Sequence, residues 1–238
     1  MIKLEKTEVF GWESAIRGMR NPMNSWDKSD SGWVYDEKQP NPNDDGDIYC
    51  TYFKIGKNDL KLMKSLVKAG SDHSKFLRMI NVTVDITAPL YWWKEFDTYK
   101  VGTVANSCST MHKITAKEFE LDDFSHEHLT NGLLDAVLKP TITVLNTARE
   151  AYLNYDEFNK KDPDGWDKGI TCQKDIWWHI IQLLPSSYNQ KRTVQLNYEV
   201  LRNIDRTGRR KNHKLDEWRE FCEWAETLPY FKEIVNPK

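Results

Sequence analysis

The most constraining stretch of this 238-residue sequence is a β-branched run that ends at an Ala-Pro pair. Residues Leu77–Thr87 alternate apolar and polar side chains over their second half, which predicts a strand with one buried face. Ala88 and Pro89 end this strand, and Leu90–Phe96 then begins as a helix with proline near its first position. The chain must therefore fold with a strand that leads directly into a helix.

Most of the other periodic segments are helical. Asn58–Ala69 has apolar residues at helical spacing and a stop signal at Gly70. A long helix is predicted from Leu129 to about Tyr155, bent or broken near Pro140, and another covers Ile176–Leu184. The last long helix is marked by an apolar stripe of Leu215, Trp218, Cys222, Ala225 and Leu228. These segments predict an α+β fold that is mostly helical around a core of strands.

The composition excludes several classes of protein. With 34 Lys+Arg against 36 Asp+Glu, the net charge of −2 argues against binding to nucleic acid or to a membrane surface. No run reaches the roughly 20 apolar residues of a membrane span, and an aromatic content of 12% argues against disorder. The charged first residues contain no apolar signal segment, so we expect a cytoplasmic protein. No composition shift divides the chain, so we expect one domain over residues 1–238.

The four cysteines and the histidines show no spacing typical of a metal site. Cys50, Cys108, Cys172 and Cys222 are scattered without a C-x-x-C pair, so we expect free thiols and no bound metal. The aromatic pairs in Tyr91–Trp93 and Trp177–Trp178 could stack on a flat ligand, but their position in amphipathic helices favours the core.

Two polar segments are candidates for a binding site. Thr98–Lys113 combines two lysines with hydroxyls and an amide that can donate to a phosphate or a base edge, namely Thr103, Asn106, Ser107, Ser109 and Thr110. The alternative is an ordinary loop whose hydroxyls cap neighbouring helices.

The second candidate segment is Asn197–Arg219. It predicts a helix up to Gly208, a tight break, and a second helix with Asn212 as its N-cap. Cations crowd the break, which favours an anionic ligand: Arg202, Arg206, Arg209, Arg210, Lys211 and His213. The alternative is a solvated basic turn.

Taken together and in this order, the segments resemble the flavin-dependent thymidylate synthases. That family has a motif R-H-R-x-x-S-x-N-E-x-S-x-R after a strand and an Ala-Pro turn, to which Val84–Trp93 and Asn106–His112 are similar. Its later L-P, T-V-N and R-x-x-x-H-A-Q-x-E-I-R elements are similar to Leu184–Pro185, Thr193–Asn197 and Arg209–Arg219. The resemblance runs from about Lys75 to the C-terminus and leaves residues 1–70 as an unassigned N-terminal extension.

The resemblance implies a role for each matching residue. Arg209 would be the catalytic arginine that polarises the pyrimidine ring of the substrate. The flavin would be bound by His213, Asn197, Asn203, Tyr99 and Lys100, and the nucleotide by Asn106, Ser107 and Ser109.

The chain also departs from the family pattern at arginines that hold phosphate. The R-H-R triplet falls on 98–101, where one cation at most survives, and Met111, a residue near Ile181, and Glu199 stand where the family has arginine. Candidates to replace the lost cations are Lys75, Arg78, Lys94, Arg17 and Arg20.

The resemblance implies an α+β fold with a central antiparallel sheet and a transferase that methylates dUMP, or a related pyrimidine deoxynucleotide, with FAD, NADPH and methylenetetrahydrofolate. It also implies a homotetramer. Two alternatives remain open. One is a non-catalytic relative that binds flavin or nucleotide as a binding or assembly module. The other is a binder of single-stranded nucleic acid, against which the negative net charge argues.

Overall fold

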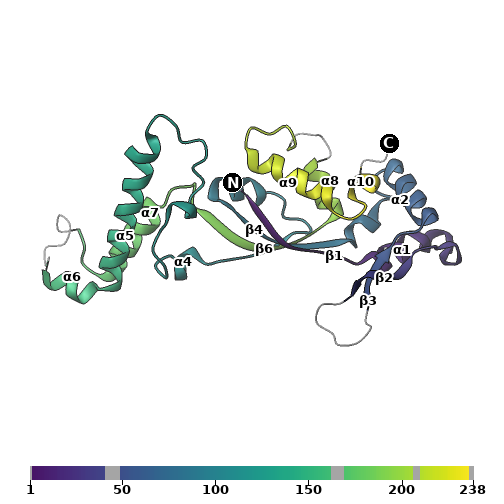
Figure 1. Ribbon diagram of the computed structural model, residues 1–238, viewed down its shortest axis with the longest axis horizontal. Coiled ribbons are helices and arrows are strands. Elements are labelled where there is room, and N and C mark those ends of the chain that lie inside the picture. Colours follow the sequence, from purple (N-terminus) through teal and green to yellow (C-terminus); the bar gives the residue numbers. More distant parts are fainter. Residues whose placement is uncertain (1, 41–48, 162–168, 206–209, 236–238) are drawn as a thin grey trace. The chain divides into compact units, whose positions relative to one another are not determined.

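The computed structural model of the protein describes residues 2–40, 49–161, 169–205 and 210–235 (Figure 1). Four strands form one antiparallel sheet in the order β1-β4-β6-β5, and β2 pairs with β3 as a separate antiparallel hairpin. In chain order the elements are β1 (Lys3–Phe10), α1 (Trp12–Arg20), β2 (Gly32–Pro40), β3 (Tyr49–Lys54), α2 (Lys57–Ala69), β4 (Asn81–Pro89), α3 (Leu90–Phe96), β5 (Val104–Ser107), α4 (Thr110–Lys113), α5 (Lys139–Leu153), α6 (Tyr155–Lys161), α7 (Gln173–Leu183), β6 (Asn189–Asn197), α8 (Tyr198–Asp205), α9 (Asp216–Thr227) and α10 (Phe231–Val235). The prediction of a mostly helical α+β fold with an antiparallel sheet is confirmed.

The strand that leads into a helix is β4, followed directly by α3. Val82, Val84 and Ile86 are fully buried and alternate along the strand as the sequence pattern predicts. Pro89 is the last residue of β4 and the N-cap of α3, where its missing N–H costs nothing. The strand begins at Asn81 rather than Leu77, because Lys75–Arg78 forms a short 3-10 turn.

Contacts along the chain group into two units. Unit 1 comprises Met1–Glu5, Asp85–Thr98 and Ala105–Thr193, and unit 2 comprises Lys6–Val84, Tyr99–Val104 and Val194–Lys238.

In unit 1, α5 packs against α7 around buried apolar side chains that include Leu145, Ala148, Ile176 and Ile180 (Figure 1). Pro140 lies in the first turn of α5, directly after a π-helical turn over Leu134–Leu138, so the helix changes its hydrogen-bond pattern near this proline but is not broken there. The predicted helix start at Leu129 is wrong, because helical structure begins only at Leu133.

The aromatic residues of α3 belong to the core of unit 1, as predicted. Trp92 and Trp93 are buried, and the Trp93 indole N–H donates to the backbone carbonyl of Gln190 at 2.9 Å. The guanidinium of Arg192 lies 4.1 Å from the Trp93 ring centre. Trp178 contradicts the core prediction, because 43% of its surface is exposed.

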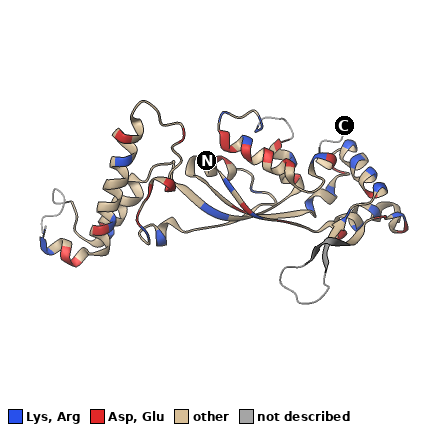
Figure 2. Ribbon diagram, in the orientation of Figure 1, with Lys and Arg blue, Asp and Glu red and all other residues tan. Residues whose placement is uncertain are grey.

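In unit 2, α2 shows how its sequence pattern forms a helix. Asp59, Met63 and Val67 recur every fourth residue and form its buried stripe. Gly70 ends the helix with φ +111°, and its N–H donates to the carbonyl of Val67. The lysines lie outside the buried stripe, at positions 57, 61, 64 and 68, and Figure 2 shows the resulting row of cations on α2.

The C-terminal part of unit 2 consists of α8, α9 and α10. Trp218, Cys222 and Ala225 are buried along α9, which confirms the predicted apolar stripe. The N-cap of α9 is Leu215, so the prediction of Asn212 as N-cap is wrong. Cys108, Cys172 and Cys222 are free thiols, in agreement with the prediction. Within the described residues, no helix has both the length and the apolar character that a membrane span needs.

Candidate functional site

Asn197 and Gly102 bring two sequence-predicted segments of unit 2 together. Asn197 ends β6 and caps α8, because its side-chain oxygen accepts the N–H of Val200 at 3.0 Å. Gly102 has φ +79°, and a Cβ at this position would lie 2.9 Å from the Asn197 amide nitrogen. Only glycine allows this close approach of the 99–104 loop to the first turn of α8.

Thr103 follows Gly102 and has an unsatisfied hydroxyl. Its Oγ1 is buried and has no hydrogen-bond partner among the described residues. A buried hydroxyl without a partner costs about 1–3 kcal/mol, so the loop holds a polar group that a bound ligand could satisfy. The loop therefore has two features of a binding cradle, a glycine at a close approach and an unpaired hydroxyl.

Tyr99 lies at the start of the same loop and holds Arg210. The Arg210 Nε–H donates to the Tyr99 hydroxyl at 2.9 Å, and the guanidinium stacks on the Trp218 ring at 4.1 Å. Tyr99 and Trp218 meet edge to face with ring centres 6.0 Å apart. Arg210 is 5% exposed, so a buried cation stands directly after the 206–209 segment.

His213 also meets Trp218 edge to face, with ring centres 6.4 Å apart. Its Nδ1 accepts the backbone N–H of Leu215 at 3.1 Å. Since Nδ1 is an acceptor, the neutral ring carries its proton on Nε2. The local chain therefore selects one tautomer of His213.

The structure thus brings together three of the five residues predicted to bind the flavin. Asn197 contacts the loop that Tyr99 begins, and both Tyr99 and His213 meet Trp218. Lys100 and Asn203 belong to the same unit and are exposed. The predicted catalytic residue Arg209 lies outside the described residues.

The residues predicted to bind the nucleotide lie in unit 1. Asn106 and Ser107 belong to β5 and are exposed. Ser109 is the N-cap of α4, and its hydroxyl oxygen accepts the His112 N–H at 3.2 Å. A capping hydroxyl is what the alternative reading of this segment predicts, so Ser109 already has a structural role.

Glu199, which stands where the family pattern has an arginine, is buried. The Arg202 guanidinium lies 3.5 Å from its carboxylate and donates to the Ser74 hydroxyl at 3.0 Å. The negative charge of Glu199 is therefore balanced within α8 by a cation one turn later.

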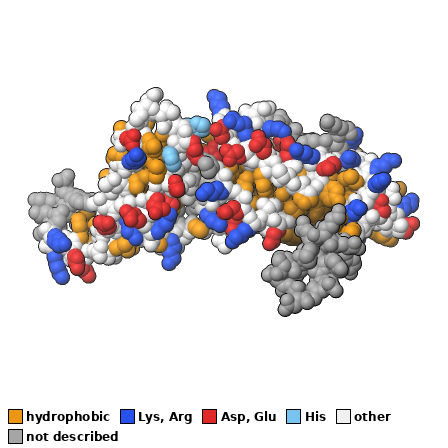
Figure 3. All heavy atoms as spheres, viewed as in Figure 1, with side chains coloured by type: hydrophobic (Ala, Val, Ile, Leu, Met, Phe, Trp, Pro, Cys, Tyr) orange, Lys and Arg blue, Asp and Glu red, His pale blue; other side chains and the backbone are white. Residues whose placement is uncertain are grey.

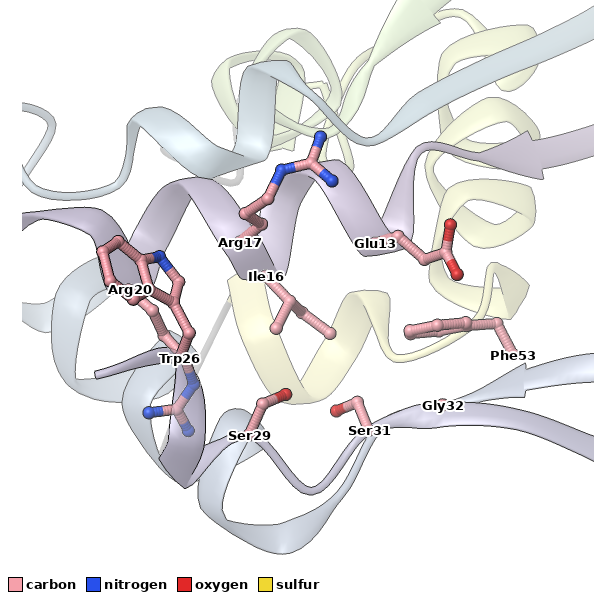
Figure 4. Close-up of a pocket in the computed structure, with 9 residues that line it drawn as sticks. All are labelled: Glu13, Ile16, Arg17, Arg20, Trp26, Ser29, Ser31, Gly32 and Phe53. Atoms are coloured by element: carbon pink, nitrogen blue, oxygen red, sulfur yellow. The ribbon is translucent and has the colours of Figure 1, made fainter. Parts of the chain in front are cut away.

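Arg20 is not a free replacement for the lost phosphate-binding arginines. Its Nε donates to Asp59 at 2.6 Å, and its other nitrogens donate to the carbonyls of Ser25 and Lys28 at 3.1 and 3.0 Å. It lines a cavity of about 390 Å³ (Figure 4), in which Ser29 and Ser31 lie below α1 and the Arg17 side chain points away from them. Arg17 is exposed and remains a candidate.

Asp59 is the buried partner of Arg20. Burial raises the pKa of its carboxyl, but hydrogen bonds from Ser31, Ser29 and Arg20 outweigh burial and hold the pKa below its ordinary value. No group of three or more His, Cys, Asp or Glu side chains in the described part of the chain is placed to hold a metal ion.

The sequence named Thr103 and Arg210 as members of the two candidate segments without a specific role, and Trp218 only as a core residue. Arg210 was one of six cations at a break, and Trp218 was one of five residues in an apolar stripe. Neither pattern indicates that the two side chains stack on each other.

Comparisons with known proteins show the fold. No family model matches the sequence, and no curated protein matches it. Among solved structures, two crystal structures of thymidylate synthase X from Helicobacter pylori, both with FAD and dUMP, align with a TM-score of 0.60. Their identities are 15% and 16%, and the alignments cover 99% and 98% of this chain and 97% of each neighbour. The chain therefore has a flavin-dependent thymidylate synthase-like fold over nearly its whole length.

Proposed function

We propose that the protein is a flavin-dependent thymidylate synthase-like enzyme that binds FAD and a pyrimidine deoxynucleotide. The observation that carries the proposal is the cradle in unit 2, where the Gly102 turn meets Asn197 beside the unpaired Thr103 hydroxyl. The neighbours of this fold are complexes with FAD and dUMP, which supports the choice of ligands.

The residues of the cradle, and the side chains that contact Trp218 nearby, have distinct proposed tasks. The Asn197 amide and the Thr103 hydroxyl would bind polar atoms of the flavin, and His213 would lie against its ring. The Arg210–Trp218 stack fixes the residue that follows the 206–209 segment. Bound FAD would carry the electron pair that reductive methylation takes from reduced nicotinamide.

Arg209 is proposed as the residue that polarises the pyrimidine ring. A guanidinium beside a uracil carbonyl stabilises the negative charge that develops on oxygen when C5 forms a bond to the transferred carbon. The substrate is dUMP or a related pyrimidine deoxynucleotide, with NADPH and methylenetetrahydrofolate as co-substrates, in a homotetramer.

The alternative proposal is a non-catalytic relative that binds flavin or nucleotide. The buried Glu199–Arg202 pair supports it, because an acidic residue occupies a position where the family pattern has a phosphate-binding arginine. Such a chain would bind FAD without forming dTMP.

The purified protein tests both proposals. A visible flavin spectrum, or uptake of added FAD, is expected for both, and a colourless protein that takes up no FAD refutes both. Formation of dTMP from dUMP, methylenetetrahydrofolate and NADPH distinguishes the enzyme from the binding module.

A pair of variants tests the role of Arg209. Arg209→Ala should retain flavin but lose dTMP formation, whereas the matched variant Lys174→Ala, on an exposed face of α7, should keep both. Unchanged turnover in Arg209→Ala would show that another residue polarises the ring. Light scattering of the purified protein tests the homotetramer.

A further inference from the structure

An aromatic groove lies in unit 2, apart from the cradle described above. It has a volume of about 460 Å³, and six of the residues that line it are aromatic: Phe10, Trp12, Trp33, Tyr52, Phe53 and Tyr230. Figure 3 shows hydrophobic side chains gathered over β1, below the C-terminal helices. Pockets of this size and lining are typical of small-molecule sites.

The floor of the groove is held in place by several contacts. Trp12 is buried and meets the Tyr198 and Tyr230 rings edge to face, with centres 5.5 and 5.8 Å apart. Tyr230 has φ +56°, and its hydroxyl accepts the N–H of Ile55 at 3.2 Å. Gly11 lies so close to the Met79 carbonyl that a Cβ would be 2.1 Å from that oxygen. The groove is therefore preformed rather than a gap between loose side chains.

The rim of the groove exposes large aromatic surfaces. Phe10, Trp33 and Tyr52 are 44%, 59% and 46% exposed. Trp33 meets Phe53 edge to face with ring centres 5.5 Å apart, so at least one pair of rim aromatics is ordered by packing. The face of an aromatic ring carries the negative side of its quadrupole, so exposed rings of this kind can attract a cation.

Glu13 gives the groove a negative charge. Among the described residues that line it, Glu13 is the one charged side chain. Its Oε1 accepts the Trp33 indole N–H at 2.8 Å, which holds the carboxylate at the groove. Arg17 lies one turn later on α1 but forms no ion pair with Glu13 within the described part of the chain, and Figure 4 shows the two side chains extending from α1 in different directions.

We propose that the aromatic groove binds a small organic cation with an alkylated ammonium head. Aromatic faces attract such a cation through their quadrupole, and a nearby carboxylate adds a full opposite charge. One carboxylate oxygen of Glu13 is already engaged by Trp33, which favours a point charge over the two-pronged fork of a guanidinium. This site is independent of the proposed flavin function.

Calorimetric titration of the full-length protein with choline tests the proposal. Saturable binding of choline is expected, with the neutral isostere 3,3-dimethyl-1-butanol at least about fivefold weaker, because it lacks the charge. Equal binding of the two compounds, or no binding of choline, overturns the proposal. Tighter binding of arginine than of choline overturns the choice of an ammonium head.

Two variants and a control locate the site. Glu13→Gln should weaken choline binding about tenfold, whereas Glu223→Gln, an exposed acid on α9 outside the groove, should leave it unchanged. Choline should also shift the indole N–H resonance of Trp33, which Trp33→Phe identifies by its loss. Unchanged choline affinity in Glu13→Gln, or an unshifted Trp33 resonance at saturation, places binding elsewhere and refutes the assignment. Since Glu13 is exposed, an unaltered thermal midpoint is expected for its variant.

Discussion

The buried ion pair between Arg20 and Asp59 makes unit 2 sensitive to a single change of charge. Asp59 is 0% exposed, and its two oxygens accept hydrogen bonds on opposite sides. Arg20 Nε donates to one oxygen at 2.6 Å, and the Ser29 hydroxyl, the Ser31 hydroxyl and the Asp30 N–H donate to the other at 2.7, 2.7 and 3.1 Å. We therefore choose Asp59→Asn, which preserves the shape and removes the charge.

The expected cost follows from the geometry. In either orientation of the asparagine amide, its NH₂ group faces a donor, which is the Arg20 guanidinium on one side or the Asp30 N–H on the other. The change also leaves the guanidinium buried without an anion. Breaking a buried pair by removing one partner costs about 3–5 kcal/mol, so Asp59→Asn should lower the free energy of unfolding by about that amount.

Urea unfolding followed by tryptophan fluorescence and by circular dichroism measures this cost. Asp216→Asn, in a partly exposed pair with Arg219 of the same unit, is the control and should cost about 0–1 kcal/mol. A loss below about 1 kcal/mol in Asp59→Asn would refute the reasoning, because it would mean that the buried pair contributes no more than a surface pair.

The same pair predicts a dependence on pH. Because the pKa of Asp59 is lower in the folded protein than in the unfolded chain, its contribution is fully present above the unfolded value of about 3.9 and is lost as the pH falls through the folded value. Below about pH 4, the stability of the wild type should therefore fall more steeply than that of Asp59→Asn. Parallel curves would contradict this.

Three further predictions concern single side chains. Thr103→Val removes a buried hydroxyl without a described partner, so the free energy of unfolding should stay the same or rise. The FAD affinity should fall by about fivefold or more. An unchanged affinity would exclude the hydroxyl from the site. Gly102→Ala places a Cβ 2.9 Å from a side-chain amide at φ +79°, so it should cost about 1–2 kcal/mol in urea unfolding and release flavin, whereas a neutral result would mean that the loop can move away. Burial raises the pKa of Cys222 to about 12, so iodoacetamide at pH 8 should label Cys108 and leave Cys222 intact until urea is added, as peptide mass mapping can show.

Local signals in the sequence predicted the helices better than the strand starts. The helix before Gly70 was predicted because its buried stripe and its stop signal are both local. The start of β4 was not, because Leu77 is buried in a short 3-10 turn and looks the same in sequence as a strand residue. A buried position favours an apolar residue in a strand and in a 3-10 turn alike. An apolar residue in the sequence therefore does not specify the backbone conformation.

The candidate site was predictable only in part, for a similar reason. Asn197 and Tyr99 were predicted from the resemblance to a motif. In the structure Tyr99 begins the 99–104 loop, and Asn197 contacts Gly102 of the same loop. The stack of Arg210 on Trp218 depends on how α9 packs. The Thr103 hydroxyl is unpaired because no described hydrogen-bonding group lies within reach of it in the folded chain. Neither relation has a fixed spacing along the chain.

The division of the chain into two units has a consequence for its genetics. The backbone passes from one unit to the other after Glu5, Val84, Thr98, Val104 and Thr193, and four of these passages fall inside the strands β1, β4, β5 and β6. Neither unit is encoded by a continuous stretch of the gene. A single recombination or truncation therefore cannot transfer one unit whole, so we expect the two units to be inherited together.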